Sequence, residues 1–350
     1  MHYPLERGRV VLRTEQDWDR DQEPVDVYDG GRCFEFRLNH ERPFLFCKPC
    51  IRDEGGLHWS VGANTLVQLS ERAQRLNPHF FSGERGSMTE VLRCPSSVLG
   101  RDLRVRLYLP PGYHENFLKR YPVLYMHDGA NLFFPEEAFL GKEWQMDRSL
   151  DLLDAMSLID RLIVVGVYAD DRERDYTLPG YRPYARALVE ELKPWIDQGY
   201  RTLSGPRTTA IMGSSLGGVV SFYCAWEHPE VFGNAACLSS TFGYKDDLLE
   251  RVRREPARTR KQLKIYLDSG WPNDNYEVTL SMAYALIERG FDLGREVLHF
   301  AFPLARHSES YWGGRVHLPL QLFSGKARRA ADRRRGIPSE TLRLRQKKRP

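Results

Sequence analysis

The stretch Gly213-Ser214-Ser215-Leu216-Gly217 places a serine at the centre of a G-x-S-x-G pattern. A β-rich apolar run, 208–212, precedes this pattern, and a helix-like run, 219–226, follows it. This order predicts a nucleophile elbow, in which glycines two residues before and after the serine let the backbone approach itself closely. We therefore expect Ser215 to be a nucleophile and the Leu216 amide to face a developing oxyanion. The alternative is a glycine-rich turn without chemistry.

A nucleophilic serine needs a histidine base, which in this type of site follows it in the chain. Four histidines do so: His228, His299, His307 and His317. His307 comes just after the apolar run 298–302, on a loop at the carboxyl end of a predicted strand, where a base can reach over the elbow. The other three lie at a helix end, inside a strand and on an amphipathic run, which favours structural or surface roles. The sequence therefore predicts His307 as the base.

Two carboxylates compete for the role of the acid that orients this histidine. Asp268 ends the predicted strand 265–268, whereas Asp274 lies deeper in the loop that follows. Asp274 would also suit the N-cap of a helix beginning at Tyr276. We favour Asp274 because its position in the loop lets it reach the His307 ring, and Asp268 remains the alternative.

The loop 127–133 follows an early predicted strand, the place from which a second oxyanion donor is expected. Gly129 permits a tight turn there, and we predict the next amide, that of Ala130, as the donor. Asp128 is expected to fix the loop by hydrogen bonds. Candidates for the substrate pocket are Asn131, Trp144 and Trp271, and the pocket rim adds Arg172, Arg174 and Tyr176. An ordinary surface role is the alternative for each rim residue.

The elements that must position these residues fall into two regimes. Residues 1–95 read as short strands separated by Gly-rich turns, with one short helix near 65–75, and predict a small all-β, sandwich-like module. From residue 96 to 325, apolar strands alternate with helices, which predicts an α/β domain whose mostly parallel sheet is covered on both faces. The expected strands are 123–127, 162–168, 210–212, 235–238, 265–268 and 298–302, and the expected helices are 146–158, 183–197, 219–227 and 276–289.

Composition limits the function classes. The 350 residues are 41% apolar, and no run approaches the ~18 apolar residues of a membrane span. The start shows no export signal, and six scattered cysteines predict reduced thiols and a cytoplasmic location. The single C-x-x-C at Cys47 and Cys50 lacks the partners of a zinc site, so neither a metal nor an organic cofactor is expected.

The net charge of +4 is misleading as an average over the chain. Residues 326–350 hold eleven Lys or Arg and two Asp or Glu, a local balance of +9, so residues 1–325 carry −5. Such a segment predicts a solvated, disordered tail, residues 326–350, and does not by itself indicate a nucleic-acid or membrane partner. The expected partner is a small-molecule or glycan-linked ester, and the oligomeric state stays open.

Residues 121–133, Tyr-Pro-Val-Leu-Tyr-Met-His-Asp-Gly-Ala-Asn-Leu-Phe, resemble the opening of the putative esterase family. That family includes enterochelin esterases, feruloyl and acetyl xylan esterases, esterase D-like thioesterases and mycolyltransferases. Further matches, covering about residues 100–325 in order, are 200–202, 211–218, 228–232, 273–274 and 307–309 with Trp312. The resemblance implies an α/β-hydrolase fold, metal-independent ester hydrolysis, and the roles proposed above for Ser215, Asp274, His307, Ala130 and Leu216. It also implies that a β-sandwich can precede the catalytic domain.

Three functions are consistent with these residues. The first is a serine carboxylic ester hydrolase with a Ser-His-Asp triad and an acyl-enzyme. The second is an acyltransferase that passes the same acyl group to an alcohol. The third is a non-catalytic ligand- or glycan-binding protein whose N-terminal module carries the function. We favour the first because the serine, acid and histidine are all present in the expected order.

Overall fold

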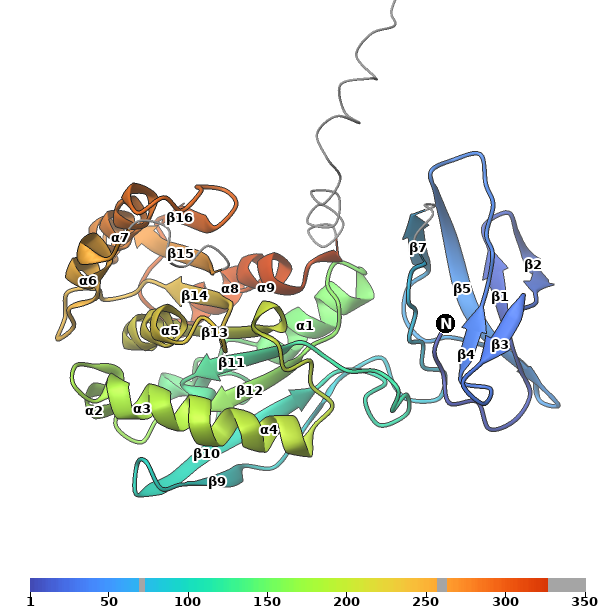
Figure 1. Ribbon diagram of the computed structural model, residues 1–350, viewed down its shortest axis with the longest axis horizontal. Coiled ribbons are helices and arrows are strands. Elements are labelled where there is room, and N and C mark those ends of the chain that lie inside the picture. The colour runs from blue at the N-terminus through green and yellow to red at the C-terminus, as the bar shows by residue number, and fades with distance from the viewer. Residues whose placement is uncertain (69–72, 257–262, 327–350) are drawn as a thin grey trace, which may run out of the picture.

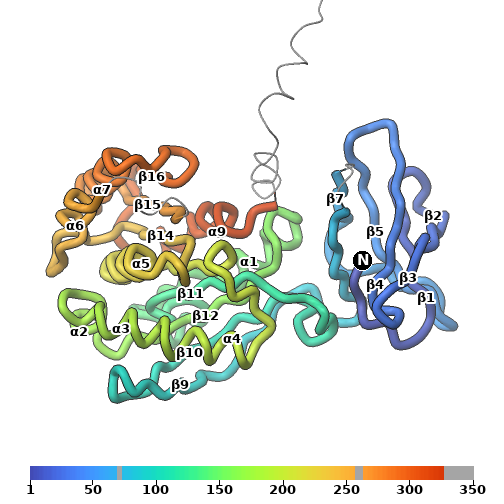
Figure 2. Tube along the Cα trace, in the orientation of Figure 1, coloured from blue at the N-terminus to red at the C-terminus, as the bar shows by residue number. Residues whose placement is uncertain are grey.

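The computed structural model of the protein describes residues 1–68, 73–256 and 263–326 (Figure 1). Of the predicted basic tail, only Lys326 belongs to the described residues. Figures 1 and 2 show an N-terminal module lying beside a larger domain. The predicted order, an all-β module before an α/β domain, is confirmed.

The N-terminal module is built from antiparallel strands. Five of them form one sheet in the order β2-β1-β5-β6, with β7 also pairing with β5, and β3 and β4 form a second sheet. Their bounds are β1 Arg9–Thr14, β2 Asp17–Gln22, β3 Asp26–Tyr28, β4 Cys33–Glu35, β5 Phe44–Asp53, β6 Gly56–Trp59 and β7 Thr65–Gln68. The expected helix near 65–75 is wrong at its start, because Thr65–Gln68 pairs with β5 and buries Val67 against Leu12. Alternating burial outweighed the helical pattern there.

The larger domain is organised around a nine-stranded sheet. The order is β16-β15-β14-β13-β11-β12-β10-β8, with β9 also pairing with β10 (Figure 1). Strands β11 to β16 run parallel to one another. Their bounds are β8 Ser87–Met88, β9 Leu92–Ser96, β10 Arg101–Leu109, β11 Val123–His127, β12 Ile163–Val167, β13 Thr209–Ser214, β14 Asn234–Leu238, β15 Lys264–Trp271 and β16 Val297–Pro303. The central strands are buried throughout, as expected for a sheet covered on both faces.

Helices cover both faces of this sheet. One face packs against α3, α4, α5, α6 and α7, and the other against α1, α8 and α9. The bounds are α1 Met146–Ala155, α2 Arg172–Tyr176, α3 Tyr181–Ala187, α4 Lys193–Gly199, α5 Leu216–Glu227, α6 Leu248–Arg254, α7 Tyr276–Glu288, α8 Glu309–Arg315 and α9 His317–Ser324, with a π-turn Leu188–Leu192 joining α3 to α4. The predicted α/β-hydrolase architecture is confirmed. No helix within the described ranges is long and apolar enough to cross a membrane.

Residues 87–96 belong to the large sheet. The strands β8 and β9 both pair with β10, so the domain begins before the expected boundary at residue 96. The loop between β10 and β11 then contacts the N-terminal module. The Glu115 carboxylate accepts hydrogen bonds from the amides of Phe80, Phe81 and Ser82 at 2.6, 3.0 and 2.8 Å. One carboxylate thus fixes the segment that leaves the module.

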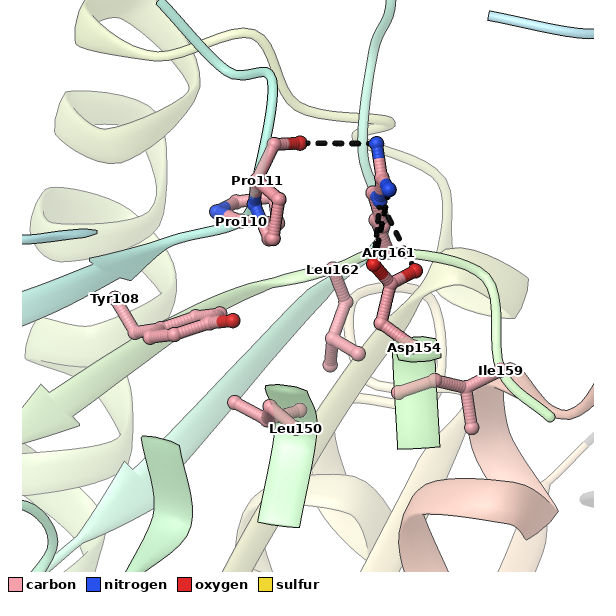
Figure 3. Close-up of a pocket in the computed structure, with 8 residues that line it drawn as sticks. All are labelled: Tyr108, Pro110, Pro111, Leu150, Asp154, Ile159, Arg161 and Leu162. Carbon is pink, nitrogen blue, oxygen red and sulfur yellow. Dashed lines mark hydrogen bonds and ion pairs between the residues drawn. The ribbon is translucent and has the colours of Figure 1, made fainter. Parts of the chain in front are cut away.

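A second contact between the two parts is made by Arg161, which also lines a small cavity of the larger domain just before β12 (Figure 3). The Arg161 guanidinium pairs with Asp154 at 2.9 Å and donates to the Pro111 carbonyl at 3.2 Å. Its Nη1 also donates to the Nδ1 atom of His79 at 2.7 Å. His79 is 1% exposed. Because Arg161 can only donate, His79 must be neutral to accept this bond.

Acid is expected to weaken this contact. Burial, assisted by the Arg161 charge, lowers the pKa of His79 from 6.5 to about 4. The unfolded chain therefore binds more protons between these pH values, so the stabilisation is complete above pH 6.5 and is lost as the pH falls through 4. The pKa shift corresponds to roughly 3 kcal/mol in the free energy of unfolding. Urea unfolding at a series of pH values measures the loss, and a His79→Gln variant that showed the same acid dependence would contradict this explanation.

Candidate active site

Ser215 lies on the sharp turn between β13 and α5. Its backbone has φ 57° and ψ −123°, a conformation that costs a non-glycine residue ~1–3 kcal/mol. The turn brings Gly213 against Gly217 so closely that a Cβ on Gly213 would lie 2.5 Å from the Gly217 carbonyl carbon. Such strain is typical of a residue whose orientation is functional. The predicted elbow geometry is therefore present, with the side chain at the carboxyl end of β13.

The histidine and one of the two candidate carboxylates meet at the same edge of the sheet. The Nδ1 atom of His307 lies 2.7 Å from the Oδ1 atom of Asp274, and the Trp312 ring packs edge-to-face with the imidazole at 4.9 Å between ring centroids. Asp274 follows β15 and His307 follows β16, and both strands run parallel to β13. Their loops therefore end at the edge that carries Ser215. Among the described residues, no hydrogen bond yet joins Ser215 to His307, a bond that often tightens only with substrate.

The loops after β15 and β16 approach each other at Gly270. A Cβ there would lie 2.1 Å from the Ala305 carbonyl oxygen and 3.1 Å from the Oδ2 atom of Asp274. A side chain at this position would separate the acid from the histidine. The glycine therefore lets two distant segments meet closely enough for the hydrogen bond to form.

Asp274 is held as a carboxylate. Burial acts to raise its pKa, but hydrogen bonds from His307, Ser239 and the Gly270 and Asn275 amides outweigh burial and lower the pKa to about 2. The amide bonds measure 2.7 and 2.8 Å. An ionised group at this place accepts the Nδ1 proton of the imidazole, which leaves Nε2 free to take a proton from elsewhere.

Asp268 occupies a different place. It lies on β15, fully buried, and accepts two hydrogen bonds from the Arg315 guanidinium at 3.0 and 2.8 Å and one from the Tyr266 hydroxyl at 2.8 Å. Burial raises its pKa, and the Arg315 charge opposes that effect. The structure thus brings Asp274, and not Asp268, to the imidazole.

The two predicted oxyanion amides lie at the beginnings of helical turns. Leu216 is the first residue of α5, and Ala130 is the middle residue of the one-turn 3₁₀ helix Gly129–Asn131. Amides in a first turn have no acceptor within their own helix, so they are available to a ligand. Ala130 follows β11 and Leu216 follows β13, and these strands are parallel neighbours.

Asp128 fixes the turn before Ala130, as predicted. Its backbone is left-handed at φ 57°, and its buried carboxylate forms a two-bond ion pair with Arg172 at 2.9 and 3.1 Å. Burial raises the pKa of Asp128 and the Arg172 charge opposes the rise. The carboxylate Oδ2 also lies close to the elbow, 3.2 Å from where a Cβ on Gly217 would be. Arg172 thus connects the α2 segment to the loop of the predicted donor Ala130.

The remaining pocket candidates lie in different environments. The Asn131 Oδ1 atom accepts the Phe139 amide at 2.9 Å, so this side chain fixes the loop that follows it. Trp144 is 3% exposed and packs against Trp312 in the core. Trp271, at the end of β15, is 49% exposed and accessible to a ligand. Of the predicted rim, Arg174 pairs with Asp175 and Tyr176 is buried.

Sequence reasoning missed Ser239 and Arg315. Ser239 follows β14 and hydrogen bonds to Asp274, and Arg315 of α8 contacts both Ser239 and Asp268. The signal for Ser239 was its place: it follows the strand that lies between the strands of Ser215 and Asp274. Arg315 had no comparable signal, because an arginine that follows two glycines is expected at the surface.

Comparisons with known proteins agree with this fold. A family model described as "Putative esterase" matches residues 96–314. The "Uncharacterized protein YjcH" of Bacillus subtilis is 31% identical over 193 residues, which make up 53% of this chain and 73% of the relative.

Two solved structures share the architecture at low sequence identity. A ferulic acid esterase superposes with a TM-score of 0.59 at 18% identity, covering 69% of this chain and 98% of that structure. The enterobactin esterase FES from Shigella flexneri has a TM-score of 0.55 at 15% identity and covers 92% of this chain and 91% of its own. The second match therefore extends over most of the N-terminal module as well.

Proposed function

Because this chain belongs to the Putative esterase family and is an esterase, we propose that it hydrolyses carboxylic esters through an acyl-enzyme formed on Ser215. His307 is the general base, Asp274 orients it, and the amides of Ala130 and Leu216 bind the oxyanion. The natural ester is not specified by these residues. The single observation that carries the proposal is the 2.7 Å bond between His307 and Asp274 at the sheet edge that holds the strained Ser215.

The mechanism follows from the chemistry of these groups. The Nε2 atom of His307 removes the Ser215 proton as the hydroxyl oxygen attacks the ester carbonyl, and the two amides stabilise the negative oxygen that forms. The C–O bond of the ester then breaks, and His307 gives its proton to the leaving alkoxide. Water attacks the acyl-serine by the same route and releases the carboxylic acid, restoring the Ser215 hydroxyl. Asp274 stabilises the imidazolium in both halves.

The arrangement needs the two amides to be in place before the reaction. The ion pair of Asp128 with Arg172 fixes the turn that carries the Ala130 amide, and the start of α5 fixes the Leu216 amide. Loss of one oxyanion donor typically costs ~3 kcal/mol of barrier. The fixed Asp128 turn is therefore part of the catalytic design in this proposal.

Ester hydrolysis is expected to dominate over acyl transfer. The acyl-enzyme can also be attacked by an alcohol, and the exposed surroundings of Trp271 and His307 admit water. Turnover of a p-nitrophenyl ester, measured with and without added alcohols, separates the two reactions by their products. A product mixture dominated by transesterification would replace the hydrolase by the acyltransferase. A panel that includes feruloyl and enterobactin esters, the substrates in the names of similar structures, then narrows the acyl group.

A further inference from the structure

Ser239 occupies a central position next to the proposed acid. It follows β14, and its backbone has φ 43°, an unusual value for a serine. The backbone is fixed on both sides, since its amide donates to the Asp268 carbonyl at 2.8 Å and its carbonyl accepts from the Asn275 side chain at 2.7 Å. The residue is fully buried, so no water competes for its hydroxyl.

The hydroxyl of Ser239 has three partners, which together fix the direction of its proton. Its Oγ atom lies 2.5 Å from the Oδ2 of Asp274, 3.0 Å from the Trp312 indole nitrogen and 2.8 Å from the Nη2 of Arg315. The indole N–H and the guanidinium N–H can only donate, so they use both lone pairs of the hydroxyl oxygen. The one hydroxyl proton must therefore point to the Asp274 carboxylate.

Arg315 is neutralised by a separate carboxylate. Asp268 accepts two bonds from it, and the side chains of this pair are 0% and 5% exposed. The positive charge therefore does not pair directly with Asp274, and the acid keeps its full charge for His307. Trp312 contributes twice, because its ring also packs on the His307 imidazole. Arg315 and Trp312 thus converge on the Ser239 hydroxyl, and Asp268 holds Arg315 in place.

We propose that Ser239 is a positioning residue of the esterase, which holds the Oδ2 atom of Asp274 so that Oδ1 faces the Nδ1 atom of His307. Asp268 acts in the same network at one remove, by holding Arg315. The inference rests on the proposed function, because it assumes that Asp274 orients the base. Ser239 itself touches neither the ester nor the nucleophile.

Ser239→Ala is expected to lower kcat about tenfold while KM stays unchanged, the effect of losing one hydrogen bond to a charged group in the transition state. The matched control is Ser240→Ala, since the neighbouring hydroxyl is also buried but has no hydrogen-bond partner in the described part of the chain. A spectroscopic measurement adds a test whose result a change in stability alone would not alter. The low-field proton resonance of the His307 Nδ1–H bond should shift or broaden in Ser239→Ala and remain in Ser240→Ala.

A double-mutant cycle with Asp274→Asn separates the outcomes. In that background Ser239→Ala should have almost no further effect on kcat. Equal losses in both backgrounds, or an unchanged kcat and proton resonance in Ser239→Ala, would overturn the inference while a large effect of Asp274→Asn still supported the triad. Wild-type activity of Asp274→Asn would instead remove the proposed function, and the inference with it. If Ser239→Ala does not fold, Trp312→Phe serves, since it keeps a ring on His307 and removes one donor; a wild-type kcat and resonance would then count against the network.

Discussion

Replacing Ser215 by alanine is expected to lower kcat for p-nitrophenyl esters by about 10⁶-fold, the loss typical of a removed serine nucleophile. Without the hydroxyl no acyl-enzyme forms, and only the oxyanion donors and substrate binding continue to accelerate the reaction. Steady-state turnover with purified protein measures the loss. A fluorophosphonate label followed by peptide mapping should modify Ser215 in the wild-type chain and leave the variant unmodified.

The neighbouring serine provides the control. Ser214 is the last residue of β13 and is buried, so Ser214→Ala removes a hydroxyl from the same turn without touching the proposed nucleophile. It should keep both turnover and labelling. Wild-type turnover in Ser215→Ala would disprove the assignment of the nucleophile. A wild-type chain that turned over no ester in a broad panel would favour the ligand-binding alternative.

Asp274→Asn is expected to lower kcat by about 10⁴-fold with little change in stability. An asparagine at this place no longer holds the imidazole with its proton on Nδ1, so Nε2 is no longer available as the base. The measurement is kcat at neutral pH, with thermal unfolding to show that the fold persists. A variant with nearly full activity would show that another group orients His307.

Asp268→Asn is expected to lower stability more than activity, the reverse of Asp274→Asn. It leaves the buried Arg315 without its charged partner, which is expected to cost about 3–5 kcal/mol in the free energy of unfolding. Urea titration measures that loss. Its effect on kcat, passed on through Arg315 and Ser239, should be much smaller than that of Asp274→Asn. If Asp268→Asn removed activity without lowering stability, the roles of the two aspartates would have to be exchanged.

The fold could be predicted from the sequence wherever burial is periodic along the chain. The predicted strand 123–127 matches β11, the predicted helix 276–289 differs from α7 by one residue, and the G-x-S-x-G turn lies between β13 and α5 as expected. These features depend on near neighbours in the chain, through side-chain period and through the glycines that a tight turn needs. The N-terminal strands were harder to predict. The start of the expected helix near 65–75 forms β7 instead, because it pairs with β5.

The candidate residues of the site followed from chain order, but their environments did not. Sequence kept both Asp268 and Asp274 open, because each lies at or after the same strand and carries the same group. It also offered Trp144 as a pocket residue, whereas the structure buries this ring against Trp312. Such outcomes depend on which distant segments pack together.

Residue patterns alone were enough to predict an α/β-hydrolase domain after an all-β module, and the order in which a serine, an acid and a histidine follow one another. Packing between distant segments settled which aspartate meets His307, and it brought the Trp312 and Arg315 side chains to the Ser239 hydroxyl that bonds to this aspartate. The difference arises because periodicity and turn chemistry act between residues a few positions apart. The Arg315–Asp268 pair joins residues 47 positions apart, and the Trp312–Ser239 bond joins residues 73 apart. Contacts over such separations exist only once the parallel strands have brought their loops to one edge.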